Sequence, residues 1–155
     1  MKKFYFSLDF LLNYKKTLED KLKVELTKLI RKQKKEEKVL KELEEKRDLY
    51  QEEVRKRERE EKMDLGLIIA YDSYLGKVNS QIEEQKDKLY RILKEKENIR
   101  KKIVDVSRQR KLLERLKEKK WLEFIFLREK SNQQVIDESA LLRFYKKSKV
   151  KDNLL

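Results

Sequence analysis

Residues 71–113 read YDSYLGKVNSQIEEQKDKLYRILKEKENIRKKIVDVSRQRKLL. Steps of alternately four and three residues from Tyr71 reach thirteen positions: Tyr71, Leu75, Val78, Ile82, Gln85, Leu89, Ile92, Lys96, Ile99, Ile103, Val106, Arg110 and Leu113. Ten of the thirteen are apolar, the exceptions being Gln85, Lys96 and Arg110. A repeat of 3.5 residues keeps such a stripe on one face of a helix and winds that face around a partner helix. Because alternation with a period of two residues is absent, a strand is excluded. We therefore predict one helix of a coiled coil here.

The partner helix is expected upstream, over about residues 7–60. A second ladder of heptad positions starts at Leu11 and continues through Lys15, Leu18, Leu22, Glu25, Leu29, Lys32, Glu36, Val39, Leu43, Lys46 and Tyr50. Leu12, Leu26 and Leu40 lie one position after ladder residues and widen the apolar stripe. Polar residues interrupt this ladder more often than the one that starts at Tyr71.

A turn is expected near residues 62–67, where the ladder is lost. Gly66 tolerates the left-handed backbone conformation, and Asp64 is suited to cap the helix that follows. A short connection makes two helices antiparallel neighbours. Position i then faces roughly position 130 minus i, so that Leu43 faces Leu89. A single continuous helix that dimerises in parallel is the alternative, and Gly66 together with the lost ladder argues against it.

The predicted fold is therefore all-α, with two long helices in an antiparallel coiled-coil hairpin and one domain over residues 1–147. The second helix is expected over about 65–130. Ser131 and Gln134 resemble a capping box, which favours a kink before further helix to about residue 145. Residues 148–155 are expected to fray. At 1.5 Å per residue, a helix of some 50 residues spans roughly 75 Å.

The amino-acid composition excludes most kinds of catalytic and metal-binding site. The chain has 155 residues, of which 47% are charged, with no Pro, no Cys and no His. Disulfides, thiolate nucleophiles, imidazole bases and the usual zinc ligand sets are thus absent. No glycine-rich phosphate loop occurs, and the adjacent carboxylates lie on solvated faces, so we expect no enzyme, no cofactor and no metal. No apolar run is long enough to span a bilayer. The basic and apolar start resembles a signal peptide, but Asp9 interrupts it and no cleavage site follows, so we expect no export by that route.

The positive charge is concentrated in the half of the chain that carries the termini. Residues 36–99 hold 15 basic and 18 acidic residues and so carry a net charge of −3. The remaining residues carry a net charge of +16, which gives the total of +13. A solubility device does not need this polarity, so we interpret it as a partner-binding feature. Nucleic acid, an anionic membrane surface and an acidic protein are the candidate partners.

Aromatic side chains gather at the same end of the predicted hairpin. Phe4, Tyr5, Phe6 and Phe10 come opposite Trp121, Phe124 and Phe126. Such a cluster acts as a hydrophobic plug that stops the helix ends from fraying, as a docking surface, or as both, because aromatics are enriched at interfaces. The sequence leaves these alternatives open.

Several motifs resemble the FliJ family of the flagellar type III export apparatus. The opening FYFSLDFLL at residues 4–12 is similar to the start of the family, and YDSYL at 71–75, followed by Val78, Ile82, Gln85 and Leu89, resembles the start of its second helix. RKLLERLKEKK at 110–120 resembles a family block, as does DESA at 137–140. The order and spacing hold to about Tyr145.

The resemblance implies a two-helix stalk, without catalytic activity, that serves the export ATPase hexamer. It implies contacts with the membrane export gate and with export chaperones, and a cytoplasmic location at the inner face of the membrane. The expected ATPase-binding residues are Phe4, Phe6, Phe10, Lys111, Lys117, Lys120, Trp121 and Phe124. The expected gate-binding residues are Leu43, Tyr50, Tyr74, Val78 and Gln85.

Two other functions compete with this interpretation. One is a nucleic-acid-binding hairpin that uses the basic half, although the charged stretches lack the interleaved aromatic residues of single-strand binders. The other is a coiled-coil spacer with a purely structural role. We therefore expect no nucleic-acid partner.

Overall fold

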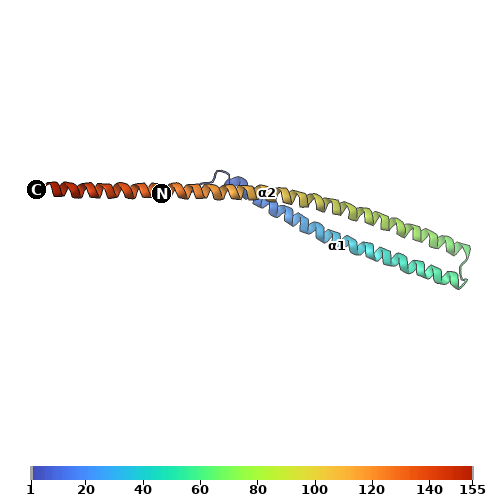
Figure 1. Ribbon diagram of the computed structural model, residues 1–155. Helices are drawn as coiled ribbons and strands as arrows, with labels where there is room; N and C mark the ends of the chain where they lie inside the picture. The colour runs from blue at the N-terminus through green and yellow to red at the C-terminus, as the bar shows by residue number, and fades with distance from the viewer. Residues whose placement is uncertain (1, 155) are drawn as a thin grey trace. The chain divides into compact units, whose positions relative to one another are not determined.

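Two long helices make up the structure, a computed structural model that describes residues 2–154. Helix α1 is Asp9–Arg59 and helix α2 is Leu65–Asp152 (Figure 1). The described residues contain no strand. The predicted all-α fold with two long helices packed against each other is thus confirmed. Contacts divide the chain into a hairpin unit, Thr17–Val106, and a terminal unit, Met1–Lys16 with Ser107–Leu155. The prediction of one domain over residues 1–147 stays a prediction.

The seam of the hairpin unit lies between antiparallel segments of α1 and α2, joined by a turn at one end (Figure 1). The buried residues of α2 are Tyr71, Val78, Ile82, Gln85, Ile92 and Val106. Every one of them is a position of the 3.5-residue ladder, which confirms the predicted inward face of this helix. Burial of an aliphatic side chain of this size contributes about 1.5–3 kcal/mol, so these residues account for much of the cohesion between the helices.

The turn is built by its backbone rather than by glycine. Lys62 N donates to Arg57 O and Glu61 N to Glu58 O, each at 3.2 Å, which is the Schellman pattern that ends a helix. Glu61 has a φ of 53°, so a glutamate and not Gly66 adopts the left-handed conformation. Asp64 Oδ1 then accepts from Leu67 N at 2.7 Å, which confirms Asp64 as the cap of α2.

The register of the hairpin is shifted from the expected one. Tyr50 was expected to face residue 80, but its ring contacts the rings of Tyr71 and Tyr74. Glu36 was expected to face residue 94, and it contacts Gln85 and Lys88. The reason lies in the turn, because α1 ends at Arg59 and α2 begins at Leu65. The midpoint therefore falls earlier than residue 65, and each α1 residue faces an earlier residue of α2.

The inward face of α1 also differs from the predicted ladder. Leu12 is 1% exposed whereas Leu11 is 39% exposed, and Glu19 is buried. Leu26 and Leu40, expected only to widen the stripe, are half-buried, whereas Val39 is exposed. The stripe therefore runs one position later at every second step. This phase buries a carboxylate but brings three leucines inward, which removes more apolar surface from water.

In the terminal unit, α2 continues farther than expected. It is helical without interruption through Ser131 and ends at Asp152, so the helix does not stop near residue 130 or 145, and residues 148–152 are helical. Gln133 Nε2 donates to Asp137 Oδ1 at 3.0 Å along this part of the helix. No Gly or Pro follows Gly76 in the chain, so no residue there strongly opposes a helix.

Candidate partner-binding surfaces

An aromatic cluster joins the N-terminal segment to α2 within the terminal unit. The Phe4 ring lies 5.1 Å from the Trp121 ring, edge to face, and 5.6 Å from the Phe124 ring. Trp121 and Phe124 stack at 5.9 Å. Such pairs contribute about 0.5–1.5 kcal/mol beyond the apolar area that they bury. The cluster thus holds the N-terminal segment against α2, as the plug interpretation predicts.

Aromatic surface in the terminal unit remains accessible to a partner. Trp121 is 41% exposed and Phe10 is 84% exposed, whereas Phe6 is buried. Phe6 therefore serves packing, while Trp121 and Phe10 present aromatic surface to solvent. A hydrophobic plug and a docking surface are both compatible with this arrangement.

The terminal unit that holds this aromatic cluster also carries three lysines expected to bind the ATPase. Lys117 Nζ lies 2.6 Å from Asp9 Oδ1, Lys120 Nζ lies 3.3 Å from Glu123 Oε2, and Lys111 is exposed. Exposed ion pairs contribute only about 0–1 kcal/mol. These ion pairs therefore add little stability, and the exposed Lys111 and Lys120 can meet an acidic partner.

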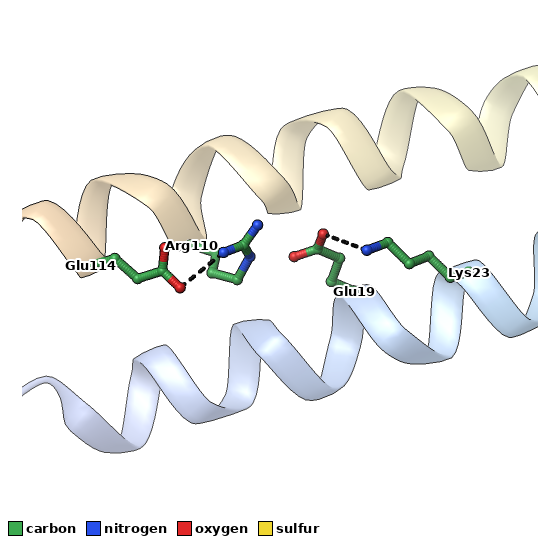
Figure 2. A network of polar contacts seen from close by, with 4 residues as sticks. All are labelled: Glu19, Lys23, Arg110 and Glu114. Atoms are coloured by element: carbon green, nitrogen blue, oxygen red, sulfur yellow. Dashed lines mark hydrogen bonds and ion pairs between the residues drawn. The ribbon is translucent and has the colours of Figure 1, made fainter.

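Further ion pairs join residues four apart on one helix. In the terminal unit Arg110 Nη1 lies 2.8 Å from Glu114 Oε1, and in the hairpin unit Lys23 Nζ lies 3.0 Å from Glu19 Oε1 (Figure 2). Glu19 is buried, so its pairing with Lys23 offsets part of the cost of desolvating a carboxylate.

Three tyrosines form a second cluster in the hairpin unit, near the turn. The Tyr50 ring lies 4.2 Å from the Tyr74 ring and 5.0 Å from the Tyr71 ring. Lys46 Nζ lies 5.7 Å from the centroid of Tyr74, and the Arg57 guanidinium lies 5.7 Å from that of Tyr71. Burial, followed by the neighbouring tyrosines, raises the pKa of the Tyr50 phenol above its usual value. The cluster combines apolar rings with cations, a combination that is typical of binding hot spots.

A polar layer crosses the seam of the hairpin unit. Gln85 Nε2 donates to Glu36 Oε2 at 2.6 Å and to Glu36 O at 3.0 Å, and Lys88 Nζ lies 3.1 Å from Glu36 Oε1. Lys96 Nζ donates to Gln33 Oε1 at 2.9 Å. The hydrogen bonds from Gln85 and Lys88 lower the pKa of the Glu36 carboxyl. Polar seam residues of this kind specify register in coiled coils.

The expected gate-binding residues are all in the hairpin unit, but they differ in accessibility. Tyr50, Tyr74 and Leu43 are half-buried. Val78 is buried, and Gln85 is 9% exposed and bonded to Glu36. Val78 and Gln85 thus have little side-chain surface to offer a partner. Both residues are positions of the 3.5-residue ladder, and a ladder position predicts a side chain that points into the seam.

Two apolar surfaces were not anticipated. Leu65, Ile68 and Ile69 are exposed on the first turns of α2. The second surface is the end of α2, where Leu141, Leu142, Phe144, Tyr145 and Val150 are all exposed. Neither surface is predicted by the seam ladder, because its residues lie outside the ladder positions. Runs of adjacent apolar residues in a chain of 47% charge were the available signal.

No group of three or more acidic residues in residues 2–154 is arranged to hold a metal ion. None of the helices described is both long and apolar enough to cross a membrane. The candidate surfaces for function are the two aromatic clusters with their cations and the exposed apolar residues at the start and at the end of α2.

The fold and these surfaces define a coiled-coil helical-hairpin protein. A family model described as Flagellar FliJ protein matches residues 4–149. The chain belongs to this family, whose members are structural components of flagellar protein export and not known enzymes. Comparisons with curated proteins and with solved structures give no match.

Proposed function

We propose that this chain is a non-catalytic stalk of the flagellar export ATPase. Its terminal unit inserts into the ATPase ring, and its hairpin unit contacts the membrane export gate. It also contacts export chaperones and is held peripherally at the inner face of the cell membrane. Family membership supports a role in export, and the two aromatic clusters support two separate protein contacts.

The aromatic cluster of the terminal unit carries the proposal for the ATPase. All the residues expected to bind the ATPase lie in this one unit: Phe4, Phe6, Phe10, Lys111, Lys117, Lys120, Trp121 and Phe124. Trp121 and Phe10 supply exposed aromatic surface of the kind that dominates binding energy. If the inner wall of the ATPase ring is acidic, the positive charge of the lysines accelerates association with it and makes this association sensitive to salt.

The tyrosine cluster supports the proposed gate contact. Tyr74 is half-buried, so part of its ring is open to a partner, while Tyr50 fixes it from the other helix at 4.2 Å. A ring held in place by its neighbour loses less conformational freedom on binding. Of the residues expected to bind the gate, Leu43, Tyr50 and Tyr74 have side chains that are accessible to a partner.

The decisive experiment measures stimulation of the ATPase by the full chain. We expect Lys111→Glu with Lys120→Glu to reduce stimulation strongly, and to do so more at low salt. Lys117 is left intact because it pairs with Asp9. The matched control, Lys41→Glu with Lys77→Glu, changes two exposed lysines of the hairpin unit and the same net charge. Normal stimulation by the first variant, or equal loss in both, contradicts the proposed insertion.

A further inference from the structure

The last turns of α2 have a pattern that the proposed stalk does not use. The tail helix, defined here as residues 141–151, reads LLRFYKKSKVK and has five basic and no acidic residues. It lies beyond the aromatic cluster that ends at Phe124. Its apolar residues are well exposed, with Phe144 at 74% and Leu141 at 67%. In the described part of the chain, nothing covers them.

The tail helix is amphipathic. At about 100° per residue, Leu141, Leu142, Phe144 and Tyr145 lie on one arc, which also holds Ser148. The opposite arc holds Arg143, Lys146, Lys147 and Lys151 around Val150. Lys149 also falls on the apolar arc, between Tyr145 and Leu142, and its Nζ is 5.4 Å from the centroid of the Tyr145 ring.

We propose that the tail helix binds an anionic lipid surface, with its apolar arc in the headgroup boundary and its lysines on lipid phosphates. Lysine-rich helices with leucine and aromatic residues on the other face lie in the membrane interface in this way. Four to eight basic residues on an amphipathic helix are typical of binding to anionic lipids. The tail helix has five.

Charge favours this occupant over a second copy of the chain. Two tail helices packed through their apolar arcs would bring together five cations each, with no acid in either segment to compensate them. An anionic surface neutralises the same charges. Helical structure already present in residues 141–151 also lowers the cost of binding, because the backbone is ordered beforehand.

The test uses the full chain with vesicles and no other protein. We expect cosedimentation with vesicles of phosphatidylcholine and phosphatidylglycerol in equal parts, and none with phosphatidylcholine alone. Lys146→Glu with Lys147→Glu and Lys151→Glu should weaken binding at least about 100-fold. Leu141→Ser with Phe144→Ser should weaken it about 10-fold or more. Circular dichroism verifies that each variant keeps its helical content.

The matched control places the same charge change on exposed lysines of the hairpin unit, as Lys34→Glu with Lys38→Glu and Lys41→Glu. It should bind nearly as tightly as the unchanged chain. Equal weakening by control and tail variant overturns the proposal, and so does equal binding to both vesicle types. Dimerisation that Leu141→Ser with Phe144→Ser abolishes, without vesicle binding, assigns the surface to a second copy and also overturns it.

An acidic protein is the remaining competitor for this surface. Loss of ATPase stimulation in the tail variant, with unchanged vesicle binding, would assign the lysines to the ATPase and overturn the lipid contact. The proposal is independent of the stalk. Because no ATPase is present in the vesicle assay, failure there leaves the ATPase result of the Lys111 and Lys120 variant untouched.

Discussion

Gln85 on α2 holds Glu36 on α1 through two hydrogen bonds, one to the carboxylate at 2.6 Å and one to the backbone carbonyl at 3.0 Å. The Gln85 side chain thus contacts both the carboxylate and the backbone of the residue opposite. A slip of α1 along α2 would break both bonds and leave polar groups in the seam unpaired. The pair therefore specifies the register of the hairpin.

Stability in acid should depend on this pair. The pKa of Glu36 is lowered in the folded chain, so its stabilising effect is present at pH values above the unfolded pKa of about 4.3. It is lost as the pH falls through the folded pKa. We expect Glu36→Gln to lower the melting temperature at pH 7 and the difference to shrink below about pH 4. Melting curves by circular dichroism measure this.

The control for Glu36 is Glu45→Gln, which neutralises an exposed carboxylate of the same helix. It should leave the melting temperature at pH 7 nearly unchanged. A difference between Glu36→Gln and the unchanged chain that stays constant down to pH 2 would contradict the assigned role of the carboxylate.

Glycine should stabilise the turn at Glu61. A side chain with a φ of 53° costs about 1–2 kcal/mol, which glycine avoids. Glycine also gives the unfolded chain more freedom, so we expect a net gain of about 0.5–1 kcal/mol for Glu61→Gly. Chemical denaturation measures it. Glu60→Gly is the matched control, because Glu60 has no positive φ, and it should destabilise.

Phe4 should control the environment of the only tryptophan. Its ring lies 5.1 Å from that of Trp121, which is 41% exposed. Phe4→Ala removes this cover, so we expect red-shifted emission from Trp121 and stronger quenching by acrylamide. Tyr5→Ala, beside it but 84% exposed, is the control and should change neither signal. Unchanged quenching in Phe4→Ala would show that the N-terminal segment does not pack on α2 in solution.

Tyr74 should bind the export gate more directly than Tyr50. Tyr50 contacts two other rings, so Tyr50→Ala should lower the melting temperature as well as any affinity. We expect Tyr74→Ala to weaken gate binding by about 2 kcal/mol, the range of a hot spot, with little loss of helicity. Calorimetry with the purified gate domain measures this. Tyr90→Ala, an exposed tyrosine of the same unit, is the control, and equal affinities for both variants would contradict the gate contact.

Periodicity was sufficient to predict the inward face of α2, because ten of its thirteen ladder positions are apolar and their neighbours are mostly polar. It was insufficient for α1, where Leu11 and Leu12 are equally apolar and only packing against α2 selects Leu12. The turn lies near the expected residues, but Gly66 is not its left-handed residue: Glu61 takes that conformation because it follows the end of α1 in the Schellman motif. The preference of glycine for the left-handed conformation was therefore outweighed by the positions at which the two helices end.

The aromatic cluster at Phe4, Trp121 and Phe124 could be predicted because both segments are rich in aromatics. The accessibility of the residues expected to bind the gate could not be predicted from the resemblance, because a motif match gives the positions of residues and not how deeply their side chains are buried. Gln85 illustrates the difference, since a glutamine at a seam position is polar in sequence and yet buried in the structure. Its partner Glu36 became evident only when the register was known.

The last part of α2 is helical although it packs against no other helix among the described residues, and this affects how its stability varies along its length. Residues 126–152 are helical while nearly all their side chains are exposed, so tertiary packing does not hold them. Starting a helix is unfavourable by a factor of about 1000, whereas extending one is nearly neutral. These residues thus avoid the initiation cost because they extend a helix already formed. Amide exchange should therefore accelerate steadily towards Asp152, where Lys149 and Lys151 in the last turn oppose unwinding through the helix dipole.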